Sequence, residues 1–219
     1  MANISEATGC VDVTVKTNQK KEFNEFYNCL REFAGYGDYF ADIDEISEND
    51  IEKEDDELFC SSGFYGVGRW TFHNNLELFG NWADSYKRTH KETVQTLEKY
   101  TFKLEFEFAD YEPGCGVLYS ENAEITHNAG EEIKNCKFSV CRCDDLPITA
   151  ENLVDYEIYD EGQVADAGDF DDVKAFIERW ADTDDMTKFS DDKIRKFCDE
   201  HRGEIIESDD IYWMLEDMN

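Results

Sequence analysis

Adjacent aspartates are the clearest chemical pattern in this sequence of 219 residues. Among the pairs are Asp55-Asp56, Asp171-Asp172, Asp184-Asp185, Asp191-Asp192 and Asp209-Asp210. Carboxylates four residues apart on a helix are separated by a rise of about 6 Å, and those two residues apart on a strand by about 6.6 Å. Neighbouring phosphates on one DNA strand are about 6–7 Å apart. A folded acidic surface can therefore reproduce a row of phosphates without containing a base.

The overall charge limits what the chain can bind. It has 53 Asp and Glu against 21 Lys and Arg, which gives a formal net charge of −32. A surface that grips nucleic-acid phosphates needs positive potential, so direct nucleic-acid binding is excluded, and an anionic membrane is disfavoured for the same reason. Disorder also fits poorly, because 41% of the residues are hydrophobic, 14% are aromatic and only two are Pro.

The negative charge is concentrated in two segments. Residues 42–57 hold ten acids and one Lys, a net of −9, and residues 144–219 hold 25 acids and seven bases, a net of −18. The remainder of the chain has a net charge of only −5. Such a partition favours acidic surfaces that contact a partner, with two aromatic residues adding contact area. The candidate partner-binding residues are Asp50, Glu52, Glu54, Asp55, Asp56, Glu57, Asp171, Asp172, Asp184, Asp185, Asp191, Asp192, Asp209, Asp210, Tyr212 and Trp213.

The spacings of the Cys, His and acidic residues do not match known metal-binding or catalytic motifs. Cys136, Cys141 and Cys143 form a CxxxxCxC pattern that is not a standard zinc spacing, and we expect Cys141 and Cys143 to share one strand face as small core residues. The acidic segments lack the ligand spacing of a calcium loop. None of the four histidines lies in a recognisable catalytic motif, and we expect His73 and His127 to be hydrogen-bonded structural residues. We therefore predict no metal, no cofactor and no catalytic residue.

The N-terminal sequence and the cysteines predict a cytoplasmic protein. Residues 1–9 lack the basic and apolar regions of a secretory signal, and no apolar run approaches the length that a membrane span needs. Eight cysteines without an export signal are most simply reduced thiols.

The hydrophobic pattern up to Gly130 predicts alternating strands and helices. Strands are expected at 10–17, 58–74, 76–82, 101–112 and 116–128, and helices at 18–34 and 85–99. Asn74-Asn75 is expected to form the turn between the second and third strands, and Ser85 to cap the second helix. Residues 42–57 are expected to form a solvated loop or a short exposed helix capped by Ser47 and Asp50. This order predicts an α+β fold with a ferredoxin-like antiparallel sheet and helices on one face.

The second part of the chain has a different pattern. We expect strands at 136–143 and 155–168, followed by helices at 170–181, 190–202 and 208–218, of which the last two begin with Ser-Asp-Asp. The predicted domains are residues 1–130, with the acidic insertion 42–57, and a smaller acidic α/β part at residues 131–219.

Residues 58–128 contain a GRW motif at 68–70, a helix before the phenylalanine-rich strand, and a YEPGCG turn at 111–116. In these features the segment resembles the YubB-type ferredoxin-like domain of plasmid, phage and other mobile-element proteins. The resemblance implies a fold and a genomic context, and it brings no catalytic residues. Separately, the charge profile resembles that of small phage-encoded anti-defence proteins, including acidic anti-CRISPRs and DNA-mimic anti-restriction proteins.

The sequence thus predicts a non-catalytic inhibitor whose acidic surfaces mimic nucleic-acid phosphates. The expected partner is a basic nucleic-acid-binding protein of the host, with a CRISPR effector as the favoured target. Three alternatives remain open: acidic faces that are merely solvated, an interaction module of a mobile element that inhibits nothing, and a carboxylate-dependent enzyme.

Overall fold

The chain folds into two compact units, which comprise residues 1–146 and 147–219. The structure is a computed structural model that describes residues 4–37, 40–180 and 189–218. Each unit has a hydrophobic core of its own, so the two are described separately.

The first unit is built on an antiparallel sheet, which has seven strands within the described residues. Its main path has the order β2-β4-β1-β5-β6-β7, and the short strand β3 pairs with β4 beside this path. The strands are β1 (Ile4–Val15), β2 (Ala41–Ile43), β3 (Glu52–Glu54), β4 (Glu57–Arg69), β5 (Phe102–Glu112), β6 (Val117–His127) and β7 (Lys137–Asp145).

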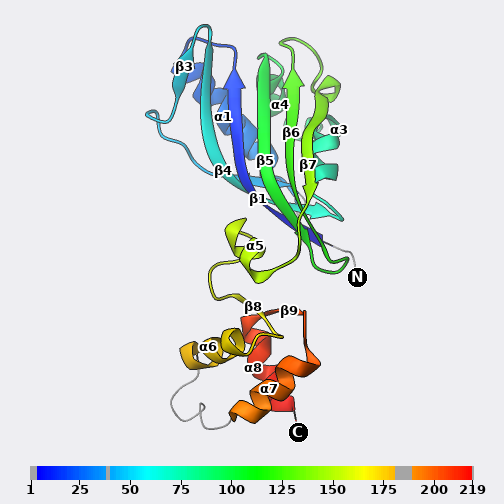
Figure 1. The fold of residues 1–219 in the computed structure, drawn as a ribbon. Coiled ribbons are helices and arrows are strands. Elements are labelled where there is room, and N and C mark those ends of the chain that lie inside the picture. Colours follow the sequence, from blue (N-terminus) through cyan, green and yellow to red (C-terminus); the bar gives the residue numbers. More distant parts are fainter. Residues whose placement is uncertain (1–3, 38–39, 181–188, 219) are drawn as a thin grey trace. The chain divides into compact units, whose positions relative to one another are not determined.

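The helices of the first unit lie on one face of this sheet and leave the other face open (Figure 1). They are α1 (Lys20–Ala34), α2 (His73–Glu77), α3 (Phe79–Tyr86), α4 (Lys91–Leu97) and the short 3-10 helix η1 (Ile133–Asn135). The alternation in β1 sends Val11, Val13 and Val15 into the layer between sheet and helices, where all three are fully buried.

Helix α1 supplies the opposite side of this layer, as its apolar periodicity predicts. Phe23, Phe26 and Leu30 are buried, and the helix ends at Gly35, whose N–H donates to the Arg31 carbonyl. The Phe26 ring lies 5.0 Å from that of Phe102 on β5, so the aromatic residues join α1 directly to the sheet.

The second unit contains four helices and a two-stranded sheet within its described residues. Its elements are α5 (Ala150–Asp155), β8 (Val164–Asp166), α6 (Phe170–Trp180), α7 (Asp191–Glu200), β9 (Ile205–Glu207) and α8 (Ser208–Asp217). The predicted helices α6, α7 and α8 are confirmed, and their apolar faces meet in a small core that includes Val173, Phe197 and Ile211. Ser190 caps α7 by accepting a hydrogen bond from the Lys193 N–H, whereas Ser208 is the buried first residue of α8 and Glu207 occupies the N-cap position.

The boundary between the two units lies after Leu146 rather than after Gly130 as predicted. Strand β7 was expected in the second domain, but it pairs with β6 along most of its length and so extends the first sheet. The antiparallel sheet with helices on one face is confirmed. The ferredoxin-like arrangement is not confirmed. In a split β-α-β unit another strand separates the two strands that a helix joins, whereas β1 and β4 flank α1 in the chain and pair directly with each other.

The predicted hairpin at 58–82 is wrong in its second half, because residues 76–77 end α2 and residues 79–82 begin α3. Leu76, Phe79 and Ala83 are buried at the three- and four-residue spacing of a helix, which the aromatic composition of this stretch obscured. Asn75 lies in α2 rather than in a turn, and its side-chain amide donates to the Val67 carbonyl (2.7 Å).

The helix predicted at 85–99 is shorter, and Ser85 belongs to α3 instead of capping α4. Of the strand predicted at 155–168, only β8 forms.

Gly9 on β1 lies so close to β5 that its position has no room for a side chain. A Cβ added there would lie 2.1 Å from the Glu107 carbonyl oxygen and 2.7 Å from the Phe108 Cα, and both of these are backbone atoms. The central strand therefore tolerates no side chain at this position without moving its neighbour.

We predict that Gly9→Ala lowers the free energy of unfolding of the first unit by about 3 kcal/mol or more, since backbone must shift to admit the methyl group. Gly35→Ala is the matched control, because Gly35 has φ −77° and only the Arg31 carbonyl near its Cβ position. The control should change stability by less than about 1 kcal/mol. Urea unfolding of both variants measures the difference, and equal effects would contradict the packing argument.

Candidate partner-binding surfaces

The first acidic segment forms strands rather than a loop or helix. Residues 42–57 include β3 and most of β2, and both strands pair with β4. The six predicted contact residues of this segment are all exposed, namely Asp50, Glu52, Glu54, Asp55, Asp56 and Glu57. We call them the β3–β4 acidic surface.

Two members of the β3–β4 acidic surface have local partners. The Ser47 N–H donates to Asp50 Oδ2 (2.7 Å), which closes a turn instead of capping a helix and lowers the pKa of Asp50. Lys16 Nζ lies 3.1 Å from Asp56 Oδ2 and lowers the pKa of that carboxyl. Asp50 and Asp56 therefore remain ionised well below neutral pH.

The second unit gathers carboxylates at the start of α6. We call Asp166, Asp169, Asp171 and Asp172 the α6 acidic cluster. Asp169 Oδ1 accepts hydrogen bonds from the N–H groups of Asp171 (2.8 Å) and Asp172 (3.1 Å). Burial first, and then the charge of Asp169, raise the pKa of Asp172. None of the four carboxylates forms an ion pair with another residue that the structure describes.

Helix α7 lies alongside the α6 acidic cluster. Lys174 Nζ pairs with Asp191 Oδ1 at 3.0 Å, and the Arg195 guanidinium lies 4.1 Å from the centre of the Phe170 ring. These contacts join the first half of α6 to the first half of α7, and we call the α6 acidic cluster together with Asp191 and Asp192 the α6–α7 acidic region. Gly168, just before α6, lies instead against Arg202 and Gly203 after α7. The positive charge of Lys174 is thus paired with Asp191, and that of Arg195 lies over the Phe170 ring.

Helix α8 carries the remaining predicted contacts. Asp210 and Trp213 are exposed, with 63% of Trp213 accessible, while Tyr212 is half-buried and packs edge-on against Phe189. Asp184, Asp185 and the side chain of Asp209 lie outside the described residues.

Sequence reasoning missed Asp166 and Asp169 as members of the α6 acidic cluster.

It also missed a row of three carboxylates on the open face of the sheet in the first unit. Asp12 on β1 is opposite Glu105 on β5, which is opposite Glu124 on β6. Like charges directly opposite one another destabilise a sheet. Lys103 relieves part of this repulsion through its ion pair with Glu105 (2.8 Å). The alternation of polar and apolar residues predicted that these three side chains lie on polar strand faces. Only the pairing register of the strands shows that they lie opposite one another.

Two buried carboxylates hold the start of α2 against the sheet. Asp110 Oδ2 accepts hydrogen bonds from the Phe72 N–H (2.7 Å) and the Tyr119 hydroxyl (2.6 Å), and burial raises the pKa of Asp110. Glu121 contacts His73 Nδ1 through both oxygens, at 2.9 and 3.0 Å. The expected hydrogen-bonded role of His73 is confirmed.

His127 also has the expected hydrogen bonds, to the carbonyls of Tyr100 and Glu131. The expectation for Cys141 and Cys143 is wrong, because both are exposed on β7, an edge strand that the helices leave largely uncovered. Cys136 does pack against the core. No group of three or more His, Cys, Asp or Glu within the described residues is placed to hold a metal ion.

Fold and surfaces together define an acidic protein of two units, with a mixed α/β architecture and an antiparallel sheet. No family model matches the chain, and neither a curated protein nor a solved structure is significantly similar to it. The resemblance to the YubB-type domain stays a prediction. No helix in the described part of the chain is both long and apolar enough to cross a membrane.

Asp110 should make the stability of the first unit depend on pH. The folded state raises its pKa above the ordinary value of 3.8, so the folded state binds this proton more tightly than the unfolded state does. The resulting stability is present at low pH and is lost as pH rises through the raised pKa. We predict that Asp110→Asn removes this decline, as measured by urea unfolding between pH 4 and 7 relative to wild type.

Asp84→Asn is the control for this prediction, since Asp84 is an exposed carboxylate of the same unit. It should leave the decline of stability with rising pH unchanged. A slope that is the same in wild type and in Asp110→Asn would contradict the assignment.

Proposed function

We propose that this protein is a non-catalytic inhibitor that occludes the nucleic-acid site of a basic host protein with surfaces that imitate phosphates. The favoured target is a CRISPR effector. The observation that carries the proposal is the α6 acidic cluster, in which four carboxylates crowd one helix start without an ion pair to any other described residue.

The amount of charge in the second unit supports a binding role over a solvated surface. Residues 147–219 hold 23 acids and seven bases, a net of −16, while residues 1–146 have the same net charge in twice the length. A net charge of about 2–8 keeps a small domain soluble. Net charge beyond the amount needed for solubility opposes folding, because like charges repel one another in the compact state. The excess is therefore best explained by a positively charged partner.

The proposed mechanism is competition for a basic channel. Carboxylates on the first turns of α6 and α7 would take the positions of phosphates, and the β3–β4 acidic surface would supply a second contact. Complementary fields accelerate the encounter of such a pair and make it sensitive to salt. Trp213 offers exposed aromatic area in the same acidic unit, of the kind that often anchors interfaces.

The context that we propose follows from the same function. An inhibitor of a CRISPR effector acts in the cytoplasm of a bacterial host and is encoded by a phage or another mobile element. A relationship of the first unit to YubB-type ferredoxin-like domains would agree with this origin, and it is supported by the GRW motif at 68–70 and the turn at 111–116.

Neutralising the aspartates of the α6–α7 acidic region should abolish inhibition without unfolding the second unit. The test variant combines Asp171→Asn, Asp172→Asn, Asp191→Asn and Asp192→Asn. We predict at least a tenfold weaker inhibition of DNA cleavage by a guide-loaded CRISPR effector, together with a loss of competition against labelled target DNA. Wild-type binding should weaken steeply between 50 and 200 mM salt, and it should be stoichiometric.

The matched control removes the same number of charges from the same unit at other exposed positions. It combines Glu151→Gln, Asp155→Asn, Asp160→Asn and Glu161→Gln, all exposed carboxylates, and it should inhibit within about twofold of wild type. Equal inhibition by both variants, or inhibition at substoichiometric protein, contradicts the proposal. So does failure of the wild-type protein to retain any basic nucleic-acid-binding protein from a bacterial lysate.

A further inference from the structure

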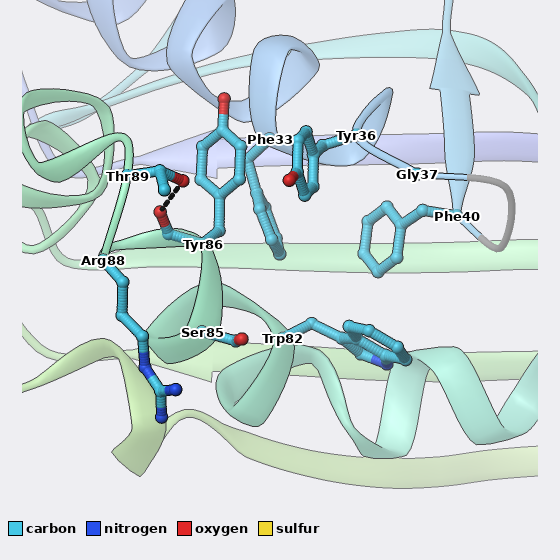
Figure 2. A pocket seen from close by; sticks show the side chains of 9 residues that line it. All are labelled: Phe33, Tyr36, Gly37, Phe40, Trp82, Ser85, Tyr86, Arg88 and Thr89. Carbon is cyan, nitrogen blue, oxygen red and sulfur yellow. Dashed lines mark hydrogen bonds between the residues drawn. The ribbon is translucent and has the colours of Figure 1, made fainter.

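An aromatic pocket lies on the helical side of the first unit, remote in sequence from the acidic region of the second. Its volume is about 320 Å³, and its walls come from the end of α1 and the residues just after it, from Phe40, and from α3 with the loop that follows (Figure 2). Five of its lining side chains are aromatic: Phe33, Tyr36, Phe40, Trp82 and Tyr86.

The rings form a floor and a rim with different exposure. Phe33 and Tyr86 are buried, with 2% and 4% accessible, and their centroids are 5.6 Å apart. Tyr36 is 57% exposed and Trp82 45% exposed, although Tyr36 contacts the Tyr86 ring at 4.6 Å. Two large rings thus stand open to water above an apolar floor, which is the arrangement of a pocket whose ligand covers the rim.

The charge near this pocket is opposite to that of the protein as a whole. Residues 85–91 contain three Lys or Arg and no acid, in a chain of net charge −32. Lys87 is neutralised by Glu98, at 2.5 and 2.7 Å. Arg88 lines the pocket, is exposed, and forms no ion pair with any described residue. No Asp or Glu is among the nine lining residues. Glu32 reaches the wall only by accepting a hydrogen bond from the Tyr86 hydroxyl (3.1 Å).

We propose that this pocket binds a small planar aromatic anion. The ring of the ligand would stack against Trp82 and Tyr36 over the floor formed by Phe33 and Tyr86. In Figure 2 the Arg88 side chain extends away from the ring cluster, so the anionic group of the ligand would leave the rings and meet the guanidinium outside them.

Volume and polarity define the size and kind of ligand. Pockets for small molecules span about 300–1,000 Å³, and this one lies at the lower end of that range, which suits one or two fused rings rather than a dinucleotide. The Ser85 and Thr89 hydroxyls are the remaining polar side chains in the lining. An aromatic carboxylate or a small aromatic phosphate has the required chemistry.

A series of probes with one ring system and three charges tests the proposal. Indole-3-acetate, indole and tryptamine are each titrated into the full chain, and backbone amide shifts are followed by NMR. We predict that indole-3-acetate binds at least about fivefold more tightly than indole, that tryptamine binds most weakly, and that the perturbed amides include those of Tyr36, Trp82 and Tyr86.

Two pairs of variants separate stacking from charge. Trp82→Ala should weaken indole-3-acetate at least about fivefold because it removes a stacking ring, whereas Trp213→Ala, an exposed tryptophan of the other unit, should have no effect. Arg88→Ala should remove the preference for indole-3-acetate over indole, whereas Lys91→Ala, a nearby cation outside the lining, should retain it. Trp82 and Arg88 are exposed, and a wild-type amide spectrum elsewhere verifies that each variant is folded.

The proposal is overturned if none of the probes shifts these amides at millimolar concentration. It is also overturned if tryptamine binds most tightly, or if Trp82→Ala binds like wild type. Parallel titrations with a phenyl carboxylate and phenyl phosphate then distinguish the two kinds of anion. Because the pocket lies in the first unit, the aspartate variants of the α6–α7 acidic region should bind indole-3-acetate like wild type. The proposed inhibitor function and the proposed pocket ligand can therefore be contradicted separately.

Discussion

The burial of one aromatic layer between the sheet and its helices is the interaction on which the first unit depends. Phenylalanines from α1, β4 and β5 meet there, with contacts such as that between Phe64 and Phe106 at 5.3 Å. Because this layer supplies the hydrophobic stabilisation on one side, the other face of the sheet is free to carry polar residues. The fold can therefore tolerate the aligned carboxylates of Asp12, Glu105 and Glu124, which a sheet without such a core would not.

The same layer explains the aromatic pocket. Phe33 and Tyr86 belong to the layer, whereas Tyr36 and Trp82 extend it beyond the point where the sheet and the helices cover it. The pocket is thus the uncovered end of the core. Its guanidinium, which has no ion pair among the described residues, gives it a charge preference, and this preference distinguishes it from an ordinary exposed apolar patch.

The second unit is governed by a different balance. Its core is small, and its net charge per residue is about twice that of the first unit. Hydrogen bonds from backbone N–H groups to Asp169, together with the positive end of the helix, offset part of the repulsion in the α6 acidic cluster. The pKa of Asp172 is nevertheless raised, first by burial and then by the neighbouring charge of Asp169. A surface that retains such repulsion in the free protein is well suited to a cationic partner.

Sequence alone determined the features that depend on local periodicity and composition. The stripe of α1, the alternation of β5, the Ser190 cap and the partition of charge were all readable, because each depends on neighbours within a few residues. The tertiary structure decided what depends on distant partners. Strand β7 joins the first unit through its hydrogen bonds to β6, residues 76–82 become helical as their apolar side chains reach the core, and Cys141 is exposed because β7 is an edge strand. Registers and packing between remote segments also align the carboxylate row and assemble the aromatic pocket, so no local pattern could have predicted either.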